Sequence, residues 1–280
     1  MPHYLPDSME VIRRALNEDI GTGDVTTQLT IDADLRANAD FIARQTGIIA
    51  GTEVVRQTLL QLDPGMEFVI HLEDGDTAAA GDKILTATGS AKAILTGERV
   101  ALNFLQRLSG IATTTSRFVA LAAGSKARIA DTRKTTPGMR ALEKYAVRVG
   151  GGRNHRFGLY DAIMIKDNHI QAAGSISQAV ERALSQASHT LSVTVECDTL
   201  EQVREALDAG ADILLLDNMS VEELTEAVEL VDGQAMTEAS GGVNEETAAA
   251  IAQTGVDIIS VGALTHSAPA LDISLDLRAL

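Results

Sequence analysis

Hydrophobic positions follow two different patterns along the chain, and the change falls near residue 127. In the first part, short apolar runs typical of strands occupy residues 35–49 and 66–87, and a segment with helical spacing, 52–62, lies between them. Residues 91–123 also have apolar positions at helical spacing, interrupted only around Gly110, which predicts one long helix or a helix pair. This irregular order of strands and helices predicts an α+β unit.

After residue 127, short apolar runs alternate with helical segments at intervals of roughly 20 to 35 residues. Two of the helical segments begin with a capping box, formed by Thr199 with Gln202 and by Ser220 with Glu223. Strands that alternate with helices indicate βαβ units and a parallel sheet, closed or nearly closed into a barrel. We count six runs, fewer than the eight strands of a standard barrel. They are Arg128–Asp131, Asp161–Ile165, Leu191–Glu196, Asp212–Leu216, Gln234–Ala239 and Asp257–Val261.

These patterns together predict an α/β protein with two domains. The first is an N-terminal α+β sandwich domain over residues 1–112, which the final segment 268–280 completes. The second, residues 113–267, is an open α/β barrel of about six to seven parallel strands.

The composition is that of an ordinary globular protein, with 45% hydrophobic and 22% charged residues. No apolar run approaches the roughly 20 residues needed to span a bilayer, and the first residues lack a secretory signal, so we expect a cytoplasmic location. The single cysteine, Cys197, excludes an internal disulfide, and its apolar neighbours predict a buried strand end in preference to a nucleophile. The sequence has no Walker motif and no GxGxxG after a strand, which argues against ATP hydrolysis and Rossmann-type dinucleotide binding.

Positive charge is concentrated in residues 131–170. This stretch holds eight Lys or Arg and four acids, a balance of +4, so the rest of a chain with a net charge of −16 carries −20. Cations gathered in a low-dielectric cleft focus their field on a ligand, which indicates a pocket for a small polyanion. Nucleic acid is not the expected partner, because aromatic residues for base stacking make up only 3% of the chain.

Polar residues follow the predicted strands of the barrel, at the end where active sites of β/α barrels lie. The first two strands are followed by cations, the third and fourth end in carboxylates, and the last two are followed by glycine turns. In chain order these are Arg133 and Lys134, Lys166, Glu196, Asp217, Ser240 with Gly241 and Gly242, and Gly262 between Val261 and Ala263.

Each of these groups has a plain structural interpretation and a functional one. A glycine turn can be a tight connection between strand and helix, but two of them on the last two strands also suit a monophosphate. Arg133, Arg156 and Lys166 can be surface charges, but guanidinium groups converging on one mouth match a dicarboxylic acid. Glu196 and Asp217 can be structural ion-pair partners, or they can bind ribose hydroxyls or a Mg²⁺ ion shared with pyrophosphate.

Three segments within the cationic stretch carry a resemblance to a known family. TRKTTPG at 132–138, GGGRNHR at 150–156 and LYDAIMIKDNHI at 159–170 resemble signature segments of quinolinate phosphoribosyltransferase, the carboxylating nicotinate-nucleotide pyrophosphorylase. The similarity extends to EDIGTGDVTT at 18–27 and to EASGGV at 238–243. It implies transfer of phosphoribose from 5-phosphoribosyl 1-diphosphate to quinolinate with Mg²⁺, yielding nicotinate mononucleotide, pyrophosphate and CO₂ in NAD biosynthesis.

The resemblance also implies roles for individual residues. Quinolinate would be held by Arg133, His155, Arg156 and Lys166, with Arg99 reaching in from the other subunit of a homodimer. Lys134, Glu196 and Asp217 would be the catalytic residues at the phosphoribosyl donor, and Mg²⁺ would bind through the pyrophosphate and these two carboxylates. The remaining substrate contacts would come from Thr132, Ser240, Gly241, Gly242, Val261, Gly262 and Ala263.

Two alternative functions stay open. One is a phosphoribosyltransferase of the same fold with another acceptor, such as the relative associated with molybdenum transport. The other is a barrel that binds a phosphorylated metabolite without catalysis. The presence of Lys134, Glu196 and Asp217 argues against the second.

Overall fold

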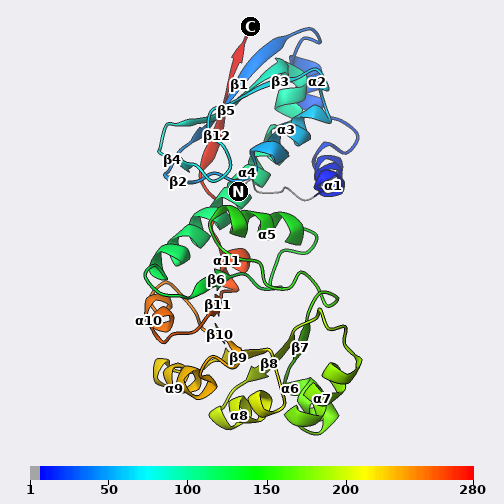
Figure 1. The fold of residues 1–280 in the computed structure, drawn as a ribbon. Coiled ribbons are helices and arrows are strands. Elements are labelled where there is room, and N and C mark those ends of the chain that lie inside the picture. The colour runs from blue at the N-terminus through cyan, green and yellow to red at the C-terminus, as the bar shows by residue number, and fades with distance from the viewer. Residues whose placement is uncertain (1–6) are drawn as a thin grey trace. The chain divides into compact units, whose positions relative to one another are not determined.

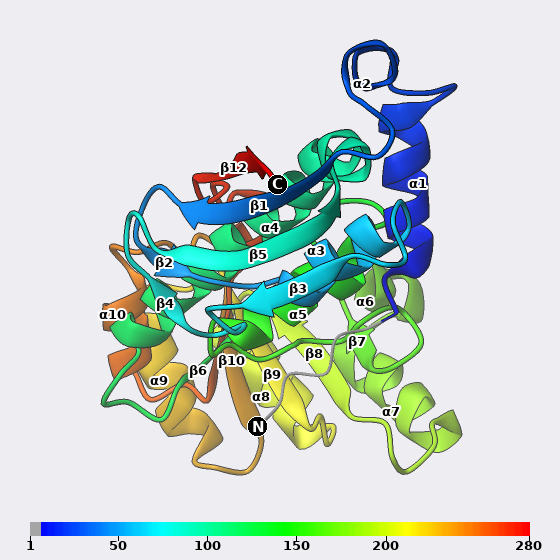
Figure 2. The ribbon, with the colours of Figure 1, turned by 90° about the horizontal axis from the view of Figure 1, so that it is seen from above.

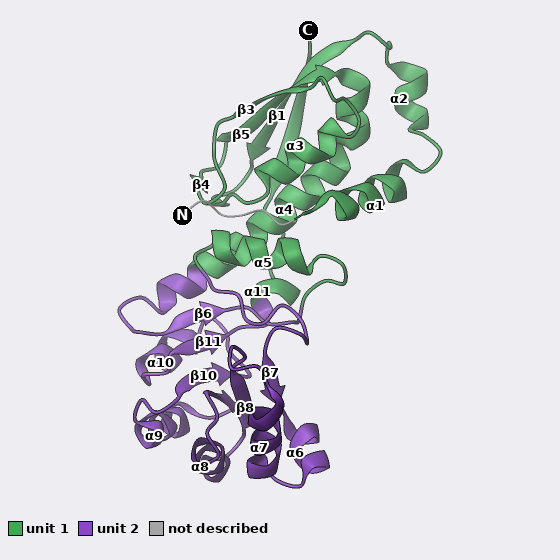
Figure 3. Cartoon of the chain, turned by 45° about the vertical axis from the view of Figure 1, so that its right-hand side comes forward, with its two compact units in different colours: residues 1–116, 135–151, 264–280 green, residues 117–134, 152–263 purple. Residues whose placement is uncertain are grey.

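The computed structural model describes residues 7–280, and the chain divides into two compact units (Figure 3). Unit 1 comprises Met1–Ser116, Thr135–Gly151 and Leu264–Leu280, and unit 2 comprises Arg117–Lys134 and Gly152–Ala263. Residues 135–151, which the sequence assigns to the barrel, thus cluster with unit 1, as does the final segment 268–280. The N-terminal pattern used to argue against a secretory signal includes residues 1–6, which lie outside the described residues.

Unit 1 is built on an antiparallel sheet with strand order β12-β1-β5-β3 (Figures 1 and 2). A small sheet pairs β2 with β4. The strands are β1 (Arg36–Ala43), β2 (Gly47–Ile48), β3 (Glu67–Ile70), β4 (Thr77–Ala78), β5 (Lys83–Ser90) and β12 (Ile273–Ala279). The helices of unit 1 are α1 (Met9–Ile20), α2 (Val25–Thr30), α3 (Thr52–Leu60), most of α4 (Ala91–Leu121), α5 (Arg140–Val149) and most of α11 (Ala263–His266).

One hydrophobic core joins this sheet to its helices. The buried side of β1 contributes Phe41, which packs in one cluster with Leu59 of α3 and Leu105 of α4. Leu271 and Ile273 enter the same cluster from the C-terminal segment, whose strand β12 pairs with β1 along its whole length. Burial of these side chains explains why a strand more than 200 residues away in the sequence belongs to this sheet.

Helix α4 is continuous through Gly110, so the helix-pair interpretation of this segment is wrong. A Cβ atom on Gly110 would lie 2.0 Å from the carbonyl oxygen of Pro269, which is backbone and cannot move aside as a side chain end would. Gly110 therefore allows the C-terminal segment to approach α4 closely, and it does not interrupt the helix.

Unit 2 contains a six-stranded parallel sheet within the described residues, with the order β6-β11-β10-β9-β8-β7. The strands are β6 (Arg128–Ala130), β7 (Ile163–Ile165), β8 (Val193–Cys197), β9 (Ile213–Asp217), β10 (Met236–Ser240) and β11 (Ile258–Ser260). They confirm the six predicted runs to within two residues at each end. The sheet is open because β6 and β7 are its edges, and a single bridge from Arg153 to Ala130 adds to the β6 edge.

Helices on the outer side of this sheet connect its strands (Figure 1). Neighbouring helices contact one another in chain order, from α6 to α10. Their bounds are α6 (Asp167–Ala173), α7 (Ile176–Gln186), α8 (Leu200–Asp208), α9 (Val221–Val231) and α10 (Ala248–Gln253). The repeated βα order, with six parallel strands, is the predicted open α/β barrel.

The two predicted capping boxes are confirmed, and one of them gives a stability test. At the start of α9, the Glu223 amide donates to Ser220 Oγ over 3.2 Å and the Ser220 amide donates to Glu223 Oε2 over 2.8 Å. We expect Ser220→Ala to lower the free energy of unfolding by about 1 kcal/mol, because one amide of the first turn loses its acceptor. Urea unfolding measures this difference.

Thr225→Ala is the matched control for that variant, because the Thr225 hydroxyl only donates to the Val221 carbonyl within the same exposed helix. Its loss leaves no helix-start amide without a partner, so stability stays unchanged or rises slightly. Equal losses for both variants would contradict a capping role for Ser220.

Within residues 7–280, no helix is both long enough and apolar enough to cross a membrane.

Candidate active site

The chemistry-bearing residues converge on a cavity of about 410 Å³ in unit 2, at the C-terminal ends of the parallel strands. Strand periodicity explains this arrangement, because residues two apart face the same side. Thus Leu215 and Asp217 of β9 both line the cavity, as do Glu238 and Ser240 of β10. The full lining is Thr132, Arg133, Lys134, His155, Arg156, Met164, Lys166, Glu196, Leu215, Asp217, Glu238, Ser240 and Ser260.

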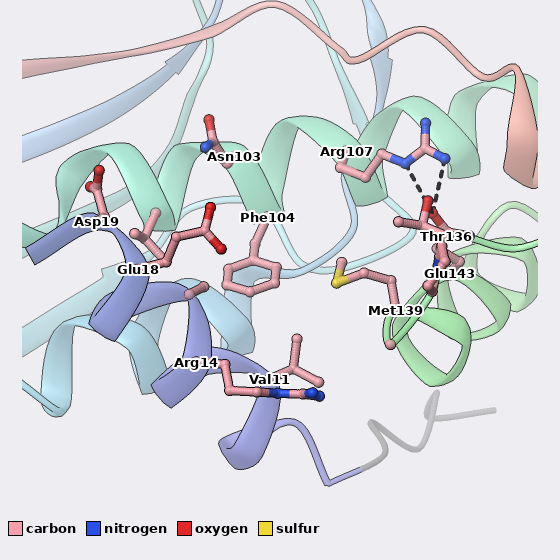
Figure 4. Close-up of a pocket in the computed structure, with 14 residues that line it drawn as sticks. Val11, Arg14, Glu18, Asp19, Asn103, Phe104, Arg107, Thr136, Met139 and Glu143 are labelled. Atoms are coloured by element: carbon pink, nitrogen blue, oxygen red, sulfur yellow. Dashed lines mark hydrogen bonds and ion pairs between the residues drawn. The ribbon is translucent and has the colours of Figure 1, made fainter. Parts of the chain in front are cut away.

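A larger cavity of about 630 Å³ lies within unit 1, between α1, α4 and the start of α5 (Figure 4). Its most buried polar group is Glu143, which accepts from Arg107 Nη2 over 2.9 Å and from the Thr136 hydroxyl over 2.7 Å. Glu143 also accepts from the Thr136 amide, so its carboxylate is occupied by protein donors. Glu143 thus ties α5 and the loop before it to α4. The larger cavity is lined by two arginines and three acids, whereas the smaller one brings two arginines, two lysines and a histidine to the strand ends.

Two guanidinium groups share one side of the unit 2 cavity. Arg156 Nη1 donates to the Ala162 carbonyl over 3.3 Å, and Nη2 approaches Met164 Sδ at 3.6 Å. Burial lowers the pKa of Arg156 and the positive charge of Arg133 lowers it further, while Asp161 acts in the opposite direction. Two like charges held together in a partly dry pocket are relieved by an anion, so this wall is suited to a carboxylate ligand.

Lys166 follows β7 and forms an ion pair with Glu196 of β8, the neighbouring strand. The Lys166 side chain remains 42% exposed and that of Glu196 17% exposed, so the pair is open to a ligand entering the cavity. His169 fixes the main chain at this position, because its Nδ1 accepts the Lys166 amide over 3.0 Å. His169 does not line the cavity, and its structural part is to anchor the start of α6.

The loop that carries His155 and Arg156 is held by the end of β6. The buried Asp131 carboxylate accepts from Asn154 Nδ2 over 2.6 Å and from the His155 amide over 2.9 Å. Backbone hydrogen bonds between Arg153 and β6 complete the attachment. This explains how GGGRNHR, a segment without regular structure, places two side chains in the cavity.

Glu238 is a cavity residue to which the sequence assigned no role. Its side chain is only 2% exposed, and Oε1 has no hydrogen-bond partner among residues 7–280. His155 Nε2 lies 3.3 Å from this oxygen. The available signal was a carboxylate inside a predicted strand, in QAMTEAS, where the alternation of faces places Glu238 with Ser240.

The predicted glycine turns stand at the ends of β10 and β11, although they do not themselves line the cavity. Gly241 and Gly242 have φ of 85° and 62°, values that favour glycine. A Cβ on Gly241 would lie 2.2 Å from Asn218 Oδ1, so the turn after β10 also passes close to the end of β9. Val261 is buried and donates its amide to Ala130, whereas Gly262 and Ala263 lead into α11.

Arg99 lies elsewhere, exposed on α4 in unit 1. It does not line the cavity of unit 2 within the chain described here. Its predicted role depends on a second subunit and stays a prediction.

Cys197 ends β8 and is fully buried, in agreement with the expectation from its neighbours. Burial, reinforced by the nearby acids Asp198 and Glu196, raises the pKa of its thiol to about 12. The thiol therefore stays protonated at pH 8, and we expect iodoacetamide to leave Cys197 unmodified in the folded protein and to alkylate it in urea. Mass spectrometry measures both, and rapid alkylation of the folded protein would contradict this burial.

Comparison with known proteins places this arrangement in a family. The model described as "Quinolinate phosphoribosyl transferase, C-terminal domain" matches residues 111–276, and that of the N-terminal domain matches residues 24–109. The chain is 48% identical over 260 residues to the probable nicotinate-nucleotide pyrophosphorylase (carboxylating) of Bacillus subtilis, covering 93% of this chain and 90% of the relative. It is 45% identical over 294 residues to quinolinate phosphoribosyltransferase (decarboxylating) 2b of Nicotiana tabacum, covering 98% and 83%.

Solved structures agree with this assignment. The crystal structure of NadC from Streptococcus pyogenes superposes with a TM-score of 0.94 at 42% identity, covering 98% of this chain and 97% of that chain. The nicotinate-nucleotide pyrophosphorylase of Francisella tularensis superposes with a TM-score of 0.93 at 41% identity, covering 99% and 98%.

Proposed function

Because the chain belongs to the quinolinate phosphoribosyltransferase family, we propose that it transfers phosphoribose from 5-phosphoribosyl 1-diphosphate to quinolinate with loss of CO₂. The products are nicotinate mononucleotide and pyrophosphate, an entry into NAD biosynthesis. One observation carries the proposal: a single cavity gathers Arg133, Lys134, Arg156 and Lys166 together with the carboxylates Glu196 and Asp217.

The acceptor occupies the cationic wall. Quinolinate carries two carboxylates on adjacent ring carbons, and Arg133, Arg156 and Lys166 supply the charges that hold them. His155 borders the same wall. Nicotinate has one carboxylate, so a site with this many cations discriminates against it by leaving charge unpaired.

The phosphoribosyl donor occupies the strand ends of β8 to β11. Glu196 and Asp217 accept from ribose hydroxyls, and the turns at Ser240–Gly242 and Val261–Ala263 present amides to the 5-phosphate. Lys134 faces the pyrophosphate and stabilises the negative charge that grows on it as the bond to the ribose breaks. The ribose carbon meanwhile becomes electron-poor, and the pyridine nitrogen of the held acceptor attacks it.

The carboxylates of the cavity suit Mg²⁺, although the protein provides only part of the coordination of the ion. The described residues contain no group of three or more His, Cys, Asp or Glu that could hold a metal ion. Glu196 and Asp217 supply carboxylate oxygens from neighbouring strands, and Mg²⁺ is commonly bound by one or two carboxylates plus substrate phosphates. When bound, the ion neutralises charge on the leaving pyrophosphate.

Decarboxylation follows from the first step. Once its nitrogen carries the ribose, the pyridinium ring is cationic and stabilises the carbanion that forms when the neighbouring carboxylate leaves as CO₂. A proton then adds to that carbon and gives nicotinate mononucleotide.

We extend the proposal to the assembly of the enzyme and to its location. The enzyme is a homodimer in which Arg99 of one subunit contacts quinolinate in the other, and it acts in the cytoplasm. Arg99 is exposed on α4, which supports its availability to a partner. Analytical ultracentrifugation of the protein and of Arg99→Ala, together with quinolinate binding by each, tests this assignment.

A steady-state assay tests the reaction itself. Purified protein is mixed with 5-phosphoribosyl 1-diphosphate, Mg²⁺ and either quinolinate or nicotinate, and nicotinate mononucleotide is measured by chromatography. We expect product from quinolinate and little from nicotinate. Binding of the donor without product from quinolinate would overturn the acceptor assignment and favour a same-fold enzyme with another acceptor.

A further inference from the structure

Glu238 is a buried carboxyl residue that the proposed reaction does not use. Its side chain lines the active-site cavity from β10 yet is only 2% exposed, and its Oε1 atom lacks a hydrogen-bond partner among the described residues. A buried acceptor without a donor costs free energy. An ordinary structural carboxylate would be surrounded by donors, as Asp131 is, so the state of Glu238 requires an explanation.

The nearby donor is the ring of His155. Its Nε2 atom lies 3.3 Å from Glu238 Oε1, on the cavity side of the sheet. The other ring nitrogen, Nδ1, lies 2.6 Å from the Arg156 main-chain nitrogen and accepts its N–H. A nitrogen that accepts carries no proton, so a neutral His155 has its proton on Nε2, directed at the carboxylate.

This arrangement links three residues in series. Glu238 fixes the ring of His155, and the ring fixes the amide of Arg156, whose guanidinium lies on the carboxylate-binding wall. Asp131 holds the preceding part of the loop through the His155 amide. The segment that carries His155 and Arg156, between α5 and β7, is thus held by Asp131 through the His155 amide and by Glu238 through the imidazole.

We infer that Glu238 is a positioning residue for the acceptor site, which orients His155 and through it the Arg156 main chain. It acts on quinolinate affinity without touching quinolinate, and both ring nitrogens of His155 face protein groups. The inference rests on the proposed function for its link to quinolinate, whereas the Glu238–His155–Arg156 linkage is a property of the folded chain alone.

Two substitutions of Glu238 are expected to have different effects on quinolinate binding. Glu238→Gln keeps an oxygen opposite Nε2, whereas Glu238→Ala removes it. We expect Glu238→Ala to raise the KM for quinolinate about tenfold, because the ring of His155 loses the side chain 3.3 Å from its Nε2, with the KM for 5-phosphoribosyl 1-diphosphate unchanged. Glu238→Gln restores most of the affinity, and Glu246→Gln, an exposed acid after the same strand, is the matched control.

Nuclear magnetic resonance of ¹⁵N-histidine protein supplies a readout independent of activity. With His155 assigned by comparison with His155→Gln, we expect a single Nε2–H tautomer in the wild type and in Glu238→Gln, and an averaged ring signal in Glu238→Ala. A changed donor KM with an unchanged quinolinate KM would overturn the inference, as would an unaltered His155 signal in Glu238→Ala. If the wild type fails to convert quinolinate, the proposed function fails, and the tautomer measurement still decides the linkage.

Discussion

Lys134→Ala is expected to lower kcat about 10³-fold, or ~4 kcal/mol of transition-state stabilisation, while the protein remains folded. Lys134 is exposed at the mouth of the cavity, four residues after the last residue of β6 and two after Thr132, whose hydroxyl accepts the Lys134 amide over 3.0 Å. In the proposed reaction its charge stabilises the leaving pyrophosphate mainly as the bond to ribose breaks, so we expect kcat to fall more than donor affinity does.

Two controls separate this effect from general loss of charge. Lys134→Gln keeps much of the side-chain length without the charge and should be as impaired as Lys134→Ala. Lys126→Ala removes a lysine that precedes β6, at the opposite end of the sheet, where its Nζ forms a largely exposed ion pair with Asp257. That variant should keep wild-type kcat, because exposed pairs contribute little. A Lys134→Ala enzyme with near-normal kcat would remove Lys134 from the catalytic residues.

Glu196→Gln is expected to lower kcat/KM for 5-phosphoribosyl 1-diphosphate about 10²-fold. The substitution removes a negative charge that pairs with Lys166 and, in the proposed reaction, faces the phosphoribosyl donor, while it keeps the size of the side chain. We also expect a higher Mg²⁺ concentration for half-maximal rate, since one of two carboxylate positions becomes neutral. Initial rates over a matrix of donor and Mg²⁺ concentrations measure both changes.

A double-mutant cycle with Lys166→Ala distinguishes a ligand role for Glu196 from an ion-pair role. If Glu196 served only to hold Lys166, the double variant would be no worse than Lys166→Ala alone. We predict that Lys166→Ala mainly raises the KM for quinolinate and that Glu196→Gln adds a further loss toward the donor. An unchanged Mg²⁺ requirement in Glu196→Gln would contradict metal contact by this residue.

The barrel was predictable because its strands are short apolar runs with caps and glycines between them. Thr199 and Ser220 begin helices as their capping boxes indicate, and the cations that follow β6 and β7 reach one cavity because parallel strands end on one edge. The family resemblance added Arg99, which periodicity alone would have left as a surface residue.

Other features depend on contacts between distant parts of the chain, which a local pattern does not contain. Gly110 resembles a helix breaker until the carbonyl of Pro269 is found against it. Helix α5 belongs to unit 1 because Leu142 and Tyr145 are buried there, with Tyr145 donating to Asp74 over 2.6 Å. Glu238 is a single carboxylate in a short strand, and its place beside His155 follows only from how the segment between α5 and β7 folds back against β6.

The most direct test of the central claim uses quinolinate labelled in the carboxyl group next to the ring nitrogen, supplied with 5-phosphoribosyl 1-diphosphate and Mg²⁺. Labelled CO₂ and pyrophosphate are measured in the same reaction. We expect both to form in equal amounts, with nicotinate mononucleotide as the nucleotide product, and neither to form with Lys134→Ala on the same time scale. Pyrophosphate without labelled CO₂, or no reaction in a folded protein that binds both substrates, would contradict it.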